Sequence, residues 1–130
     1  MTARRASLGV LGLAFVGIAL AACGSSGSPA ATAASFPPDA ALVVAQGEAF
    51  TKGSVTVPAD KAFSLVLDNR DGEPHNVTIL AKDSSGKSPF VGEVFSGPSA
   101  RLYSVPALPA GTYQFRCDVH QQMTGTIVAG

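Results

Sequence analysis

Residues 112–123 read TYQFRCDVHQQM, and the alternation at the start of this stretch decides the fold class. Tyr113, Phe115 and Cys117 alternate with polar neighbours, which is the pattern of a half-buried β-strand. Because side chains two residues apart share a face of a strand, the Cys117 sulfur is expected to point towards the core. His120 follows at an odd offset, so a continuing strand would place it on the opposite face. The backbone is therefore predicted to turn immediately after Cys117.

Other short apolar or alternating runs lie on both sides of this stretch. They occupy residues 42–44, 54–57, 63–67, 75–79, 91–95, 101–105 and 124–129. Turn-forming residues separate them, most clearly in the cluster DNRDG at residues 68–72. No sustained helical period occurs beyond residue 22. We therefore predict an all-β domain over residues 41–130, an antiparallel sandwich or barrel of about seven to eight strands.

The composition excludes several classes of protein. The 130 residues include nine Lys+Arg and nine Asp+Glu, so the formal net charge is zero, and the body of the chain has no basic cluster. With neither a basic patch nor any Trp, nucleic acid is not an expected partner. An apolar fraction of 46% argues against a disordered chain. The length suits one domain and is too short for an enzyme with a separate cofactor-binding domain.

The first 23 residues, MTARRASLGVLGLAFVGIALAAC, have the pattern of a targeting segment. Two arginines precede an apolar run over residues 8–22, whose length suits a signal peptide and is short for a membrane span. The sequence Leu-Ala-Ala before Cys23 resembles the lipobox of bacterial lipoproteins. That resemblance implies cleavage after residue 22 and lipidation of Cys23. An ordinary secretory signal and an uncleaved membrane anchor are the two alternatives.

The lipobox resemblance also implies a location and a domain order. Residues 1–22 would be the signal peptide, and residues 23–40 would be the acylated cysteine followed by a flexible linker rich in Ala, Ser and Pro. The domain at residues 41–130 would then be extracytoplasmic, in the periplasm or on the outer face, and anchored by lipid to the cell membrane.

Four side chains beyond the lipobox carry metal-binding donors. They are His75, Cys117, His120 and Met123, and together they are all the His, Cys and Met that follow Cys23. Two imidazoles and a thiolate in a trigonal plane, with a weak axial thioether, form the ligand set of a blue copper site. His75 is in phase with Val77 and Ile79, so it can point inward from its own strand.

The segments that hold these donors resemble the cupredoxin family. The resemblance is carried by EPHNV at residues 73–77, by Cys-x2-His-x2-Met-x-Gly at residues 117–125, and by the strand leading into that loop. The short His-x2-Met spacing is similar to amicyanin-type members. Gln121 departs from the Pro that such loops often carry, and Asp118 departs from the small hydroxyl residue found in many members.

This resemblance implies a Greek-key cupredoxin sandwich that binds one type 1 copper ion through His75, Cys117, His120 and Met123. Asn76 would tie the two ligand segments together by hydrogen bonds. The implied function is single-electron transport between envelope redox partners, with an unidentified partner protein, a membrane anchor and a monomeric state. No catalytic residue is expected, so the protein would not be an enzyme.

Other readings of the same residues remain open. An extracytoplasmic lipoprotein that stores or delivers copper would use the same four ligands. A metal-free adhesion or ligand-binding sandwich would treat Cys117 as a plain buried thiol. A Cys23–Cys117 disulfide requires that Cys23 is not acylated. A hydrolytic dyad of Cys117 and His120 lacks a convincing orienting residue.

Overall fold

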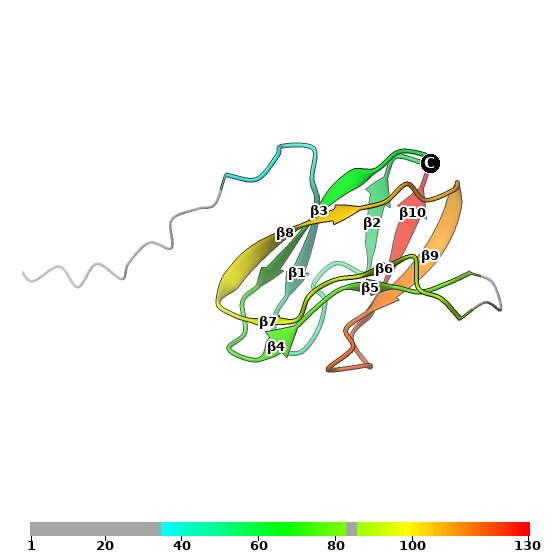
Figure 1. The fold of residues 1–130 in the computed structure, drawn as a ribbon. Helices are drawn as coiled ribbons and strands as arrows, with labels where there is room; N and C mark the ends of the chain where they lie inside the picture. Colours follow the sequence, from blue (N-terminus) through cyan, green and yellow to red (C-terminus); the bar gives the residue numbers. More distant parts are fainter. Residues whose placement is uncertain (1–34, 83–85) are drawn as a thin grey trace, which may run out of the picture.

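The computed structural model describes residues 35–82 and 86–130, and all regular secondary structure in these residues is β (Figure 1). The strands are β1 (Ala41–Ala45), β2 (Ser54–Val57), β3 (Phe63–Asn69), β4 (Pro74–His75), β5 (Thr78–Ile79), β6 (Phe90–Val91), β7 (Phe95–Ser96), β8 (Ser99–Val105), β9 (Gly111–Arg116) and β10 (Thr124–Ala129).

Two sheets pack face to face, and a short ribbon lies at one end (Figure 1). One sheet has the strand order β1-β3-β8, and the other has the order β2-β10-β9-β5-β6. Strands β4 and β7 pair only with each other, near the loop that joins β9 to β10 (Figure 1). The predicted all-β sandwich is therefore confirmed.

The expectation of a purely antiparallel sandwich was wrong for two strand pairs. Strand β1 pairs with β3 in parallel, and β10 pairs with β2 in parallel. Side-chain alternation is the same in parallel and antiparallel strands, so it does not reveal the relative direction of two strands. The direction follows from the connections, because β1 and β2 are consecutive in the chain but belong to different sheets.

Two of the expected strands are each divided into two short strands. The run at residues 75–79 becomes β4 and β5, and the run at residues 91–95 becomes β6 and β7. The two parts of each run pair with different strands. In the first run, β4 pairs with β7, and β5 pairs with β6 and β9. In the second run, β6 pairs with β5, and β7 pairs with β4. The break after His75 separates the ribbon at the end of the sandwich from the five-stranded sheet.

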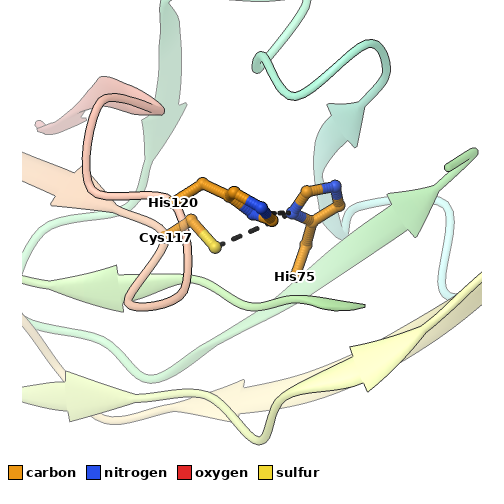
Figure 2. A group of neighbouring side chains, drawn as sticks. All are labelled: His75, Cys117 and His120. Atoms are coloured by element: carbon orange, nitrogen blue, oxygen red, sulfur yellow. Dashed lines mark hydrogen bonds between the residues drawn. The ribbon is translucent and has the colours of Figure 1, made fainter. Parts of the chain in front are cut away.

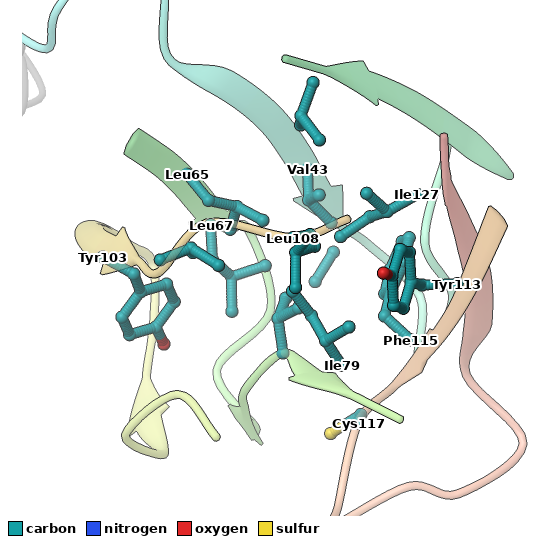
Figure 3. Packing of buried hydrophobic residues seen from close by; sticks show 14 of the residues in the cluster. Val43, Leu65, Leu67, Ile79, Tyr103, Leu108, Tyr113, Phe115, Cys117 and Ile127 are labelled. Atoms are coloured by element: carbon teal, nitrogen blue, oxygen red, sulfur yellow. The ribbon is translucent and has the colours of Figure 1, made fainter. Parts of the chain in front are cut away.

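The core lies between the two sheets and reaches the end that carries Cys117 (Figure 3). Phe115 is fully buried, and its ring centroid lies 5.0 Å from that of Phe50. The Phe115 ring also covers its cross-strand neighbour Gly125, where an added Cβ would overlap the ring. Cys117 directly follows β9 and is in phase with Phe115, and both side chains belong to the same buried cluster, so packing of the aromatic ring helps to position the thiol.

Most of the predictions for the N-terminal segment concern residues that the structure does not describe. Cys23, the expected signal segment and most of the expected linker lie outside the described residues, and β1 begins at Ala41. Over residues 35–82 and 86–130, no helix has the length and apolar character needed to cross a membrane.

Candidate metal centre

Three of the predicted donors converge at one end of the sandwich (Figure 2). His75 ends β4, Cys117 directly follows β9, and His120 lies in the loop between β9 and β10. Their donor atoms all lie within 4.8 Å of one another. The His75 and Cys117 side chains are fully buried, whereas His120 is partly exposed. The site is therefore closed on the protein side and reaches solvent at His120.

The spacing of these donors fits a trigonal metal site. His120 Nδ1 lies 3.2 Å from His75 Nδ1, and Cys117 Sγ lies 3.8 Å from His75 Nδ1. Metal bonds of about 2.0 Å to nitrogen and about 2.3 Å to sulfur, spread at about 120°, would separate the nitrogens by about 3.5 Å and nitrogen from sulfur by about 3.7 Å. These two observed distances are close to the expected values, and all three donor atoms lie within 4.8 Å of one another, so one ion fits between them.

The chain turns directly after Cys117, as the odd offset of His120 predicts. The Met123 amide donates to the His120 carbonyl at 2.9 Å, and the Cys117 amide donates to the Met123 carbonyl at 3.0 Å. These two bonds close a loop whose ends are held together. Met123 is buried and belongs to the same apolar cluster as Cys117. His75, Cys117, His120 and Met123 thus have the arrangement of a type 1 copper site.

Asn76 links the two segments that carry the ligands. The Asp118 amide donates to Asn76 Oδ1 at 2.8 Å, and Asn76 Nδ2 donates to Asp118 Oδ2 at 2.9 Å. Asn76 Nδ2 also donates to the Gly92 carbonyl at 2.9 Å. Because Asn76 is adjacent to His75 and Asp118 is adjacent to Cys117, these bonds set the distance between the two ligands.

Asp118 belongs to this network through its carboxylate. Thr78 Oγ1 donates to Asp118 Oδ2 at 2.5 Å, and Arg116 Nε lies 3.5 Å from Oδ1. Partial burial opposes ionisation, but hydrogen bonds from Thr78 and Asn76, together with Arg116, outweigh it and lower the pKa of Asp118. The aspartate at position 118, where many cupredoxins have a small hydroxyl residue, therefore places an ionised carboxylate against the Asn76 side-chain amide.

A second carboxylate, which the sequence analysis treated only as a turn residue, contacts a ligand directly. Asp71 Oδ2 lies 3.0 Å from His75 Nε2. Asp71 also accepts hydrogen bonds from the Gly47 amide at 2.8 Å and the Glu48 amide at 3.1 Å. These two backbone bonds are the main reason that the pKa of Asp71 is lowered. The available signal was the four-residue spacing from Asp71 to His75 in DGEPH.

Buried Asn69 fixes the loop that carries Asp71 and His75. Asn69 Nδ2 donates to the Glu73 carbonyl at 2.9 Å and to the Phe95 carbonyl at 3.1 Å, and Asn69 Oδ1 accepts from the Asp71 amide at 3.0 Å. A Cβ at Gly97 would overlap the Asn69 carbonyl and lie 2.5 Å from the Asp71 carbonyl. The close approach of these backbones therefore requires glycine at position 97.

Comparisons with known proteins agree with this architecture. The family of cupredoxin-like domains matches residues 13–129. The amicyanin structure from Paracoccus versutus (Thiobacillus versutus) is 25% identical with a TM-score of 0.58, and the match covers 73% of this chain and 85% of amicyanin. A reduced tryptophan-to-tyrosine mutant of amicyanin is 24% identical, with a TM-score of 0.58 and coverage of 73% and 86%.

The fold also matches a dithionite-reduced auracyanin from the photosynthetic bacterium Roseiflexus castenholzii. That structure is 18% identical with a TM-score of 0.57, and the match covers 68% of this chain and 94% of auracyanin. No match was found among curated protein sequences.

Proposed function

Since the chain belongs to the cupredoxin-like family, we propose that it is a type 1 blue copper protein that carries single electrons between redox partners in the cell envelope. The observation that supports this most directly is the convergence of His75, Cys117 and His120, whose donor atoms lie within 4.8 Å of one another. Two imidazoles with one thiolate suit copper, and the trigonal arrangement with a methionine nearby is that of an electron-transfer site.

Each donor has a role in this proposal. When bound, copper would supply a centre that accepts and releases one electron. Nδ1 of His75, Nδ1 of His120 and the Cys117 thiolate would hold it, and the buried Met123 thioether would be a weak fourth ligand.

The frame around these donors favours electron transfer over catalysis. His75 and Cys117 are fully buried at the ends of strands, and the Asn76–Asp118 bonds tie their segments together. Ligands that are held this firmly move little between oxidation states, which lowers the barrier to electron transfer. The same burial disfavours ready release of the metal, so we rank copper delivery behind electron transport.

The partly exposed His120 gives the route for electrons. Its neighbour Val119 is 45% exposed, so an apolar side chain borders the one ligand that reaches solvent. A redox partner protein that covers Val119 would shorten the distance from its own centre to the copper through His120. A single-domain monomer is sufficient for this role.

Tethering belongs to the same proposal. Acylation of Cys23 would hold the domain on the extracytoplasmic face of the cell membrane, where the linker lets it reach membrane-bound partners. Incorporation of labelled fatty acid into the wild-type protein, and its loss in Cys23→Ala, is the expected result. A Cys23→Ala variant that remains labelled would contradict the anchor.

Copper titration of the purified protein tests the function. We expect stoichiometric binding of one copper ion, an intense visible thiolate-to-copper band and reversible one-electron reduction. Cys117→Ser should abolish the band, because the serine hydroxyl cannot provide the charge-transfer transition. The matched control is Ser104→Ala, an exposed change on β8 that should leave the spectrum unchanged. A colourless wild-type protein in the presence of Cu(II) would reject the proposal.

A further inference from the structure

Asp71 joins His75, a ligand of the proposed copper site, to the turn that follows β1 of the three-stranded sheet. We infer that Asp71 is a positioning residue that fixes the His75 imidazole with Nδ1 facing the metal and biases the site towards Cu(II). The second part of this inference rests on the proposed function, whereas the first part concerns the protein without metal. The inference gives a role to Asp71, which is not one of the four proposed copper ligands.

The Asp71 carboxylate is held from outside the metal site. Gly47 and Glu48 donate consecutive backbone amides to its two oxygens, at 2.8 Å and 3.1 Å. Both residues have positive φ angles, 64° and 54°, in the turn that follows β1. Two successive amides in such a turn form a concave binding site for an anion. The carboxylate therefore has its position before any metal binds.

The remaining contact of this carboxylate selects one form of the His75 ring. A carboxylate can only accept a hydrogen bond, so the 3.0 Å contact with Asp71 places the proton of neutral His75 on Nε2. Nδ1 then carries the free lone pair, and it is the atom that faces His120 Nδ1 at 3.2 Å and Cys117 Sγ at 3.8 Å. The ring therefore presents the correct atom to the metal with no need to reorient.

The same contact has an electronic consequence. A carboxylate that accepts the distal N–H of a metal-ligating imidazole makes that imidazole a stronger base. A more basic ligand with a negative charge behind it stabilises the doubly charged ion more than the singly charged one. Asp71 should thus lower the reduction potential of the site.

The other nearby carboxylate provides a contrast. Asp118 directs its oxygens to Thr78, Asn76 and Arg116. Its effect is on the backbone link between the ligand segments, whereas Asp71 acts on a ligand ring. The two carboxylates can therefore be separated by experiment.

Asp71→Asn is the decisive change, because it removes the charge while it keeps one oxygen, which can accept from one of the two amides that Asp71 now binds. The matched control is Asp68→Asn on β3, three residues before Asp71. It removes the same charge, but from an exposed ion pair with Arg70. Asp71→Glu keeps the carboxylate and should restore most of the wild-type behaviour. If Asp71→Asn does not fold, the position of the His75 proton in the wild-type protein still decides the positioning role.

Two measurements on the full protein decide the inference. Nitrogen-15 NMR of the metal-free protein should find the His75 proton on Nε2 in the wild type and in Asp68→Asn, with this preference reduced in Asp71→Asn. With copper, Asp71→Asn should weaken Cu(II) binding by about 10- to 100-fold and weaken Cu(I) binding less. Each tenfold gap between the two effects raises the one-electron midpoint potential by about 59 mV.

The possible failures differ from one another. A His75 proton on Nδ1 in the metal-free wild type overturns the positioning role. An Asp71→Asn variant that keeps both the blue band and the wild-type potential overturns the electronic role. A wild-type protein that binds no copper rejects the proposed function and the electronic role with it, while the NMR result still decides whether Asp71 positions His75.

Discussion

Replacement of Asn76 by alanine should destabilise the metal-free protein strongly, because this side chain links the two ligand segments. Asn76 is 1% exposed and makes hydrogen bonds to the Gly92 carbonyl and to both the amide and the carboxylate of Asp118. In Asn76→Ala the Gly92 carbonyl and the Asp118 amide lose their partner. A buried polar group without a partner costs about 1–3 kcal/mol, so we expect a loss of about 3–4 kcal/mol.

Urea denaturation of metal-free protein, followed by circular dichroism, measures this loss. We expect a lower midpoint with an unchanged slope, since the surface exposed on unfolding is nearly the same. A loss of that size is a large fraction of the 5–15 kcal/mol (roughly) that stabilises a small domain. The matched control is Gln114→Ala, an exposed change on β9 that should alter stability by less than about 0.5 kcal/mol.

Two results would refute the reasoning about Asn76. If Asn76→Ala lost less than about 1 kcal/mol, either its bonds would not form or their groups would be solvated in the native protein. If the loss were as expected but the blue band of the copper-loaded variant kept its position and intensity, Asn76 would stabilise the fold without setting the distance between His75 and Cys117.

Three further predictions follow from the packing and the site. Gly125→Ala should cost about 1–3 kcal/mol because its methyl group overlaps the Phe115 ring, whereas Gly53→Ala, which meets no atom within 4 Å, should have little effect in the same urea assay. Burial raises the pKa of Tyr103 to about 12 from its ordinary value of 10. Below pH 10 this group should not change the free energy of unfolding. Between pH 10 and about 12 that free energy should fall, because the hydroxyl then ionises in the unfolded chain but not in the folded one. Tyr103→Phe should remove that alkaline loss and the corresponding tyrosinate absorbance, and an unchanged titration would contradict the burial argument. Copper at a hundredfold excess over its dissociation constant should stabilise the fold by about 2.7 kcal/mol and raise its Tm, and a chelator should reverse that rise. The Tm of Cys117→Ser should rise much less on addition of copper. An equal rise would show that copper binds elsewhere.

Much of the strand pattern could be read from local sequence. The alternation of Tyr113 and Phe115 corresponds to β9, which ends one residue before Cys117, because burial on one face of a sheet imposes a period of two on the sequence. The need for a turn after Cys117 followed from the same period. The directions of β1 and β2 did not, since the direction in which a strand pairs depends on the sheet that it joins and not on its own side chains.

The candidate site shows the same division. The sequence by itself determined the donor types, because the chemistry of thiolate, imidazole and thioether is a property of the residues. Only the tertiary structure placed His75 beside Cys117, 42 positions away in the chain, with their donor atoms 3.8 Å apart. It alone directed Asp71 to the His75 ring, because the turn at Gly47 and Glu48 comes from another part of the chain. The chemical type of each side chain is fixed by its own position in the sequence, whereas the position and environment of a ligand arise from contacts between segments that only folding brings together.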